Sequence, residues 1–334
     1  MKLRFFVPII FVILVFASCK QNNNAEKYAH LPEELAQLFI QIDNDPTNPD
    51  LYEQRATYYI KQRNVDSAYF DAYAALRYDS LNPDRYIFLA DLFFMQGLFE
   101  NSEEVLERAH QKNPKNVEVM TKLAEIHLFY KRYTEMNDFL DKALELDNRN
   151  PQAYFMKGFA LKEQGDTLNA IRHFNKAVDQ NPTYFDAYIQ LGLMYHARLN
   201  PLALDYYNNA LNINPQSIQA NYNVAMFYQE TKNIEKAKER YHIILQIDPE
   251  NAWAHHNLGW VAMELEKNNE KAVEHFTNAL NIEPYFLEAA YNRGAAYEKM
   301  GQRQLAIDNY NHVLKIDPNY DMALERLYKL GIRK

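Results

Sequence analysis

The feature that most constrains this chain is an internal repeat of 34 residues. Proline follows an acidic or amide residue at the end of successive units, and Pro249, Pro284 and Pro318 lie 34–35 residues apart. Between these prolines, apolar residues recur at fixed offsets, which we number as positions 1–34 of each unit. Positions 4, 7, 8 and 11 share one face of a first helix, and positions 20, 24, 27 and 28 share one face of a second. The sequence therefore predicts stacked helical hairpins from Pro49 to Tyr320.

Residue size supports this pairing of helices. Position 8 is Ala or Gly in every unit, and a large residue at position 24, such as Tyr207 or Phe276, can fill the space that the small residue leaves. Position 7 departs from the apolar pattern with Arg55, Lys157 and Arg293. We expect their aliphatic stems to pack while their charges reach water.

The pattern resembles the tetratricopeptide repeat, W-x2-L-G-x2-Y followed by A-x3-F and P within 34 residues. Residues 287–320 carry the match at positions 4, 7, 8, 11, 20, 24, 27 and 32 with Ala290, Arg293, Gly294, Tyr297, Ala306, Tyr310, Val313 and Pro318. The resemblance implies an all-α solenoid, a right-handed superhelix of antiparallel hairpins. We assign eight repeats: 49–82, 83–116, 117–150, 151–184, 185–217, 218–251, 252–286 and 287–320.

Two repeats depart from 34 residues: 185–217 has 33 and 252–286 has 35. We expect both changes in the turn between the paired helices, near Asn200-Pro201 and Lys267–Asn269. The segments on either side of the repeats, 31–48 and 321–334, are each predicted to form one capping helix. Caps with a polar outer face complete a solenoid.

The N-terminus has the anatomy of a signal peptide, with Lys2 and Arg4 before an apolar run of 13 residues, Phe5 to Ala17. The one cysteine of the chain, Cys19, follows at once and resembles the lipidated cysteine of the bacterial lipobox, although Phe16 stands where that motif usually has an aliphatic residue. Residues 1–18 are therefore predicted to be a lipoprotein signal peptide, Cys19 the site of lipidation (palmitate among its acyl groups), and 19–30 a polar tether. The alternatives are an ordinary signal peptide or an uncleaved anchor.

Composition excludes several kinds of function. The 8 glycines are not clustered, so no phosphate-binding loop is available, and a single cysteine rules out a cysteine-based zinc site. A net charge of −8 disfavours binding to nucleic acid. No catalytic motif is present, and we expect no enzyme activity, no metal, no small-molecule substrate and no cofactor apart from the lipid on Cys19.

In the resembled family, positions 2, 5, 6, 9, 12 and 13 of each first helix face the concave groove. Position 6 carries amides, which can both donate to and accept from a peptide backbone, in Gln54, Gln190, Asn223, Asn257 and Asn292. This resembles the asparagine ladder of O-GlcNAc transferase; simple inheritance of a repeat consensus explains the pattern equally well. Positions 5 and 9 add mostly apolar side chains that either bind a partner or pack between helices: Phe155, Phe159, Leu193, Tyr222, Met226, His256, Trp260 and Tyr291.

These features predict a lipid-anchored scaffold that binds an extended peptide or protein in its groove. The anchor suggests the bacterial cell envelope, at the outer membrane on its periplasmic or surface side, in the assembly of a larger complex. One alternative is a glycan-binding envelope module, because sugars stack on exposed tyrosine rings. Another is a structural adaptor that uses its convex face.

Overall fold

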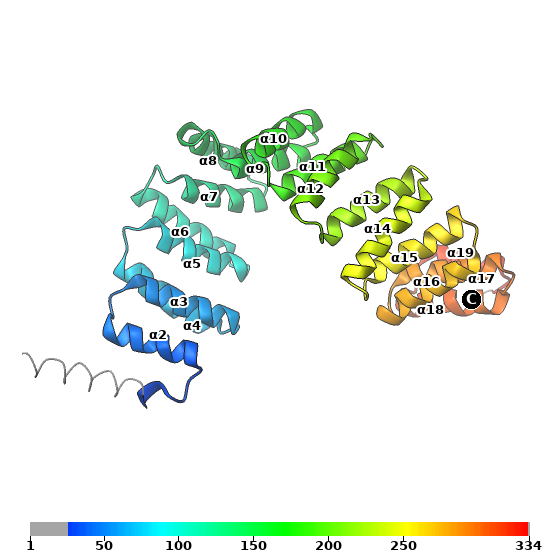
Figure 1. The fold of residues 1–334 in the computed structure, drawn as a ribbon, viewed down its shortest axis with the longest axis horizontal. Coiled ribbons are helices and arrows are strands. Elements are labelled where there is room, and N and C mark those ends of the chain that lie inside the picture. Colours follow the sequence, from blue (N-terminus) through cyan, green and yellow to red (C-terminus); the bar gives the residue numbers. More distant parts are fainter. Residues whose placement is uncertain (1–25, 333–334) are drawn as a thin grey trace, which may run out of the picture. The chain divides into compact units, whose positions relative to one another are not determined.

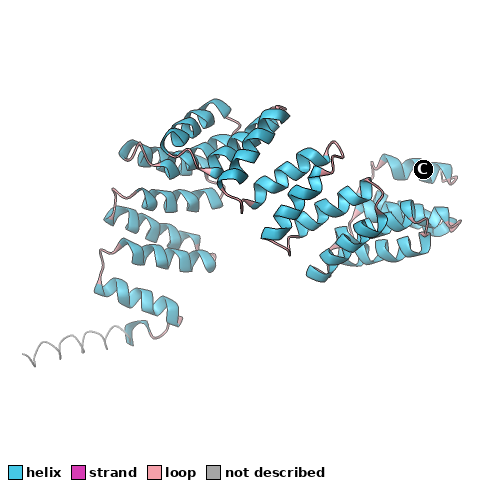
Figure 2. Ribbon diagram, turned by 45° about the horizontal axis from the view of Figure 1, so that its top comes forward, coloured by secondary structure: helices cyan, strands magenta, loops and turns pink. Residues whose placement is uncertain are grey.

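The computed structural model describes residues 26–332. In this range the chain consists of helices joined by short loops, with no strand (Figure 2). The all-α prediction is confirmed. The chain divides into two compact units, residues 1–160 and 161–334, and we describe each by itself. The predicted signal peptide and Cys19 lie outside the described residues.

After a short helical segment at residues 26–28, the first unit has a single helix, α2, and continues as helical hairpins (Figure 1). Its helices are α2 (Glu33–Asn44), α3 (Pro49–Lys61), α4 (Val65–Tyr78), α5 (Pro83–Met95), α6 (Phe99–Lys112), α7 (Val117–Phe129), α8 (Tyr133–Leu146) and α9 (Pro151–Glu163), whose last turn crosses the boundary.

The second unit continues the hairpins and ends with a single helix, α19 (Figure 1). Its helices are α10 (Thr167–Gln180), α11 (Phe185–His196), α12 (Leu202–Ile213), α13 (Ile218–Glu230), α14 (Ile234–Ile247), α15 (Ala252–Trp260), the π-helix η1 (Val261–Leu265), α16 (Asn269–Ile282), α17 (Leu287–Lys299), α18 (Arg303–Ile316) and α19 (Asp321–Lys329).

Local sequence explains where these helices begin and end. Asn48 and Asn82 cap α3 and α5 by accepting hydrogen bonds from backbone N–H groups, and a proline follows each of them in the first turn. The turn between paired helices needs a residue of positive φ. Gly97 supplies it at φ 73°, where glycine has no steric cost, and Arg63 occupies the equivalent place at φ 57°.

The core is built on the predicted contact between positions 8 and 24. Tyr207, Phe276 and Tyr310 are fully buried, and each lies over the glycine at position 8 of its own hairpin. A Cβ at Gly259 would lie 2.7 Å from Phe276 Cε1, which is too close for two carbon atoms. The need for a small residue at position 8 is therefore confirmed.

The charges at position 7 do not reach water as expected. Arg55 is buried, and its guanidinium donates from Nε and Nη2 to the Asp71 carboxylate at 2.8 and 2.6 Å. Arg293, in the last repeat, donates from Nε to Asn309 Oδ1 at 2.8 Å. Asp71 and Asn309 both occupy position 23, so the second helix of the hairpin supplies an acceptor where the first supplies arginine. A buried guanidinium requires such a partner.

The extra residue of repeat 252–286 does not lie in the turn near Lys267–Asn269 as expected. It is taken up inside the first helix, which changes from α-helix to π-helix at Val261–Leu265. The backbone N–H of Glu266 donates to the Val261 carbonyl, five residues back, and Lys267 then has the φ of 59° that is typical of these turns. A π-turn inserts one residue without breaking the helix.

The ends also differ from expectation. Within the predicted tether, residues 26–30 are described, and Tyr28 is buried against Phe39 with its hydroxyl donating to Asp43 at 2.9 Å. At the other end α19 buries Ala323 and Leu327, but its outer face is partly apolar. Tyr328, which occupies position 8 of a following unit, is 67% exposed.

Candidate functional site

An open cleft of about 680 Å³ lies against the first hairpin of the first unit. Residues at positions 2, 5, 6, 9, 10 and 13 of α3 form one side, and α2 forms the other. Five of these six positions are ones that the family resemblance assigns to a groove. The lining residues are Glu34, Gln37, Leu38, Gln41, Asp50, Glu53, Gln54, Thr57, Tyr58, Lys61 and Phe88.

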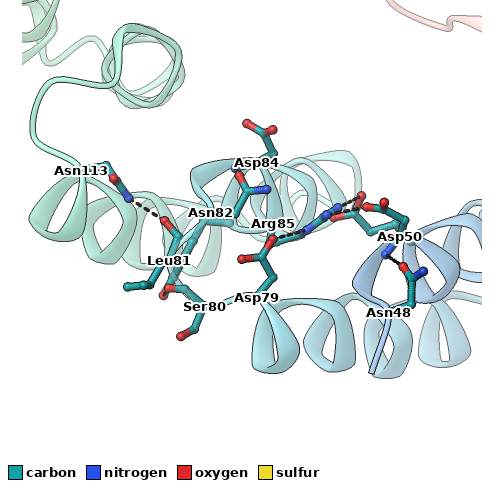
Figure 3. A network of polar contacts seen from close by, with 11 residues as sticks. Asn48, Asp50, Asp79, Ser80, Leu81, Asn82, Asp84, Arg85 and Asn113 are labelled. Atoms are coloured by element: carbon teal, nitrogen blue, oxygen red, sulfur yellow. Dashed lines mark hydrogen bonds and ion pairs between the residues drawn. The ribbon is translucent and has the colours of Figure 1, made fainter. Parts of the chain in front are cut away.

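Arg85 of α5 fixes two of the carboxylates of this cleft. Its Nη1 lies 2.7 Å from Glu53, its Nη2 contacts Asp50, and its Nε lies 3.4 Å from Asp79 (Figure 3). The side chain of Arg85 is about one-tenth exposed, so the guanidinium is held in a fixed position between two repeats. Three carboxylates around one guanidinium leave this end of the cleft with excess negative charge.

Glu53 is the most constrained of these acids. Its Oε1 is buried without a hydrogen-bond partner, while its other oxygen is paired with Arg85. Burial raises the pKa of the Glu53 carboxyl, although the hydrogen bond from Arg85 opposes that shift.

In the second unit, the predicted amides form bonds between repeats. Asn257 donates to Tyr222 Oη at 3.3 Å, and Asn292 donates to His256 Nε2 at 3.0 Å. In each pair, position 6 of one repeat donates to position 5 of the repeat before it. Burial lowers the pKa of His256, so its ring stays neutral and Nε2 can accept. The pattern continues into the cap, where Arg326 lies 3.5 Å from Tyr291 Oη.

Asn223 interrupts this series of hydrogen bonds. Position 5 of the preceding repeat is Ile189, a buried side chain with no acceptor. The Nδ2 atom of Asn223 is accordingly buried without a partner. Gln190 differs again, since its Oε1 accepts from Lys162 at 2.8 Å.

The predicted apolar groove residues are mostly part of the packing between helices. Leu193, Met226, Trp260 and Tyr291 are partly buried against the cores of their own repeats, as is Tyr222, and His256 is buried beside Phe276 and Phe286. Phe155 and Phe159 lie on α9 with ring centroids 6.3 Å apart, in the first unit, whereas the other residues of this set belong to the second.

Residues 26–332 contain neither a candidate metal centre nor a candidate membrane span. No group of three or more His, Cys, Asp or Glu side chains there is arranged to hold a metal ion. Across the same residues, no helix combines the length and apolar character needed to cross a membrane.

The cleft was not predicted from the sequence, because the predicted groove was based on the amides and aromatic residues of the middle repeats. A signal was present: α2 is a lone helix beside α3, and positions 2, 5, 6, 9 and 13 of α3 are all polar. The role of Arg85 could not be read locally, since its partners lie up to 35 residues away.

Comparison with known families agrees with the repeat assignment. Models described as tetratricopeptide repeat match residues 218–251 and 287–320, the boundaries of two of the eight repeats. A model of the TT21 fifth ARM repeats domain matches residues 84–195.

Curated relatives match over part of their length. Tetratricopeptide repeat protein 6 of Homo sapiens is 29% identical over 158 residues, 46% of this chain and 30% of that protein. Anaphase-promoting complex subunit 3 of Schizosaccharomyces pombe is 25% identical over 223 residues, 66% of this chain and 33% of that protein. This chain thus spans about a third of the length of these two relatives.

Solved structures share the fold. The C-terminal part of a TPR repeat-containing protein from Cytophaga hutchinsonii superposes with a TM-score of 0.59 at 18% identity, over 71% of this chain and 98% of that one. The pilF protein of Pseudomonas aeruginosa gives 0.53 at 21% identity, over 63% and 96%. With its hairpins, its position 8 contacts and its two matched repeats, the chain is a tetratricopeptide repeat protein.

Proposed function

We propose that this protein is a scaffold that binds an extended peptide or protein segment along the first helices of its hairpins. The observation that carries the proposal is the open cleft between α2 and α3, because groove positions of a first helix line it. One of the relatives reported above, anaphase-promoting complex subunit 3, is by its name part of a multiprotein complex. Complex assembly is therefore the role that we assign.

The cleft offers three kinds of contact to a peptide. Gln37, Gln41 and Gln54 are exposed amides, which can pair with backbone N–H and C=O groups of any sequence. Phe88 supplies an apolar wall. Asp50 and Glu53 are fixed by Arg85, so little side-chain entropy is lost there on binding.

The second part of the proposal is a lipid anchor. Lys2, Arg4, the apolar run and Cys19 support export and lipidation, which would hold the protein on the bacterial cell envelope, at the outer membrane. We propose no catalytic activity and no cofactor beyond that lipid. The mass of the mature N-terminus checks the anchor, and an unmodified Cys19 or cleavage elsewhere would contradict it.

Site-specific photo-crosslinking tests the cleft. A photoreactive amino acid placed at Gln54 should yield discrete protein adducts in cell envelopes, whereas the same group at Glu107, exposed on α6, should yield none of these. The substitution Thr57→Arg, which fills the cleft, should remove the adducts from position 54. Equal adducts at both sites would favour a partner on the convex face, and capture of polysaccharide alone would favour a glycan-binding module.

A further inference from the structure

A second surface of the first unit lies outside the cleft between α2 and α3, although three of its residues stand at positions 12 and 13, which the family resemblance assigns to the groove. At the turns inside two adjacent hairpins, apolar side chains gather where α5 passes into α6 and where α7 ends. The ring centroids of Phe94 and Phe99 are 5.0 Å apart, and those of Phe99 and Phe129 are 4.1 Å apart. We call this surface the turn-edge patch, and it consists of Phe94, Met95, Leu98, Phe99, Phe129 and Tyr130.

The turn-edge patch is open to solvent. Met95 is 59% exposed, Leu98 42% and Phe129 55%. Single exposed apolar residues are common, but a contiguous exposed group such as this one marks a contact with a partner or a membrane.

The fold itself does not require apolar residues at these places. Met95 and Phe129 occupy position 13, where the repeats 218–251 and 287–320 of the second unit have Glu230 and Lys299. The chain thus builds the same hairpin with charged residues at the site that is apolar in this patch.

The fold does not require an apolar residue at Leu98 either, which lies at the start of α6. It stands at the N-cap of α6 and makes no capping bond, whereas Asn64 and Asp166 at the equivalent place accept from the backbone N–H groups of Ser67 and Asn169. Loss of such a cap costs about 1 kcal/mol. An exposed apolar side chain thus stands where a polar one could cap the helix.

The position of the patch indicates what it touches. Since paired helices are antiparallel, the turns between α5 and α6 and between α7 and α8 lie on the same edge of the unit as the start of α2 (Figure 1). Glu26 is 7 residues after Cys19 (26 minus 19). An extended chain of that length spans at most about 25 Å, comparable to the width of two or three packed helices.

We propose that the turn-edge patch rests on a lipid bilayer and inserts its apolar side chains at the boundary between headgroups and acyl chains. This inference rests on the lipid anchor proposed above, because a tether at Cys19 raises the local concentration of the patch at the membrane. Weak insertion of a few apolar side chains then suffices to orient the unit. The exposed edge would face the membrane, leaving the cleft between α2 and α3 to a partner.

The test uses the chain from Lys20 onward with an N-terminal hexahistidine, held on vesicles of phosphatidylethanolamine and phosphatidylglycerol by a nickel-chelating lipid. This chain contains no cysteine, so Gln96→Cys or Leu81→Cys can carry a single environment-sensitive dye. Residue 96 lies between Met95 and Leu98 of the patch, while Leu81, itself 75% exposed, lies in a loop between repeats at the opposite edge. We expect a blue shift and strong quenching by brominated acyl chains at 96, and neither at 81.

The control for folding is a variant in which patch residues are replaced by the residues that other repeats of the chain have at the same positions. M95E, L98N and F129K together should abolish the dye response at 96 while leaving the thermal midpoint unchanged or higher. Equal responses at 96 and 81, or a response that survives this variant, would overturn the proposal and leave the patch to a protein partner. The nickel tether replaces the natural lipid, so the result does not depend on how Cys19 is modified.

Discussion

The ring of Tyr207 packs directly on the backbone of Gly192, so closely that a Cβ there would lie 2.2 Å from Cε1 of the ring. Gly192→Ala should therefore force the helices α11 and α12 apart. We expect a loss of stability of about 1–3 kcal/mol from overpacking, partly offset by the better helix propensity of alanine, about 1 kcal/mol.

Thermal midpoints of matched variants check this prediction. Gly294→Ala should cost less, because its Cβ would lie 2.9 Å from Tyr310 Cε1. Ala225→Gly, at the same position of another repeat, should also destabilise, since there the helices are already spaced for a methyl group. A Gly192→Ala variant as stable as the parent would contradict the close-contact account.

The amides at position 6 should differ in their contribution to stability. Asn257→Ala removes the bond to Tyr222 and should cost about 1 kcal/mol. Asn223→Ala removes a buried Nδ2 that has no partner, so it should be neutral or stabilising. Urea denaturation of the two variants decides the matter, and equal losses would show that the bond between repeats is not what distinguishes them.

Acid should weaken the hairpin of α15 and α16. Burial lowers the pKa of His275 to about 4, with His255, 5.9 Å away between ring centroids, adding to the shift together with Lys271 and His242 while Glu274 opposes it. Since the folded pKa lies below the unfolded value near 6.5, protonation favours the unfolded state. The stability is complete above pH 6.5 and falls as pH drops from about 6.5 to 4.

The size of this effect is at most about 3 kcal/mol, at 1.36 kcal/mol per pKa unit. His275→Phe removes the titrating group and should flatten the dependence of the thermal midpoint on pH between 7 and 4. His312→Phe, on α18, is the matched exchange for comparison, because that ring lies near the surface with Nε2 3.0 Å from the Pro284 carbonyl. An unchanged slope in His275→Phe would refute the assignment.

Removing one partner of the Arg55–Asp71 ion pair should lower the free energy of unfolding. Asp71→Ala leaves a buried guanidinium without a counter-charge, and we expect a loss of about 3 kcal/mol. Asp71→Asn should cost less, because Asn309 already serves as the acceptor of Arg293 at the same position. Chemical denaturation measures both, and a larger loss for asparagine than for alanine would argue against the pair.

Most of the fold could be predicted from the 34-residue period of the repeat. Caps such as Asn48 and Asn82, the glycine turn at Gly97 and the small residue at position 8 are local signals; the small residue recurs in every unit, and the caps and glycine turns recur in several. The sequence could not show that Val261–Leu265 is a π-helix, because an inserted residue is equally compatible with a longer turn.

The site was harder to foresee. Asn257 and Asn292 occupy groove positions in the family, yet each contacts a side chain 35 or 36 residues earlier in the chain. Such pairs depend on how one hairpin stacks on the next, and a pattern within one repeat does not reveal that geometry. The cleft likewise depends on α2, which has no partner helix of its own and so belongs to no repeat.

The π-turn in the seventh repeat also has a consequence for how such arrays change length. Deleting one residue within Val261–Leu265 should convert this segment to ordinary α-helix and leave the turn at Lys267 intact. An insertion inside a helix leaves the lengths of the loops unchanged, although length variation between repeats is usually looked for in the loops. The extra residue of the π-turn lies directly after Trp260. Its loss would rotate the side chains before the π-turn relative to those that follow it.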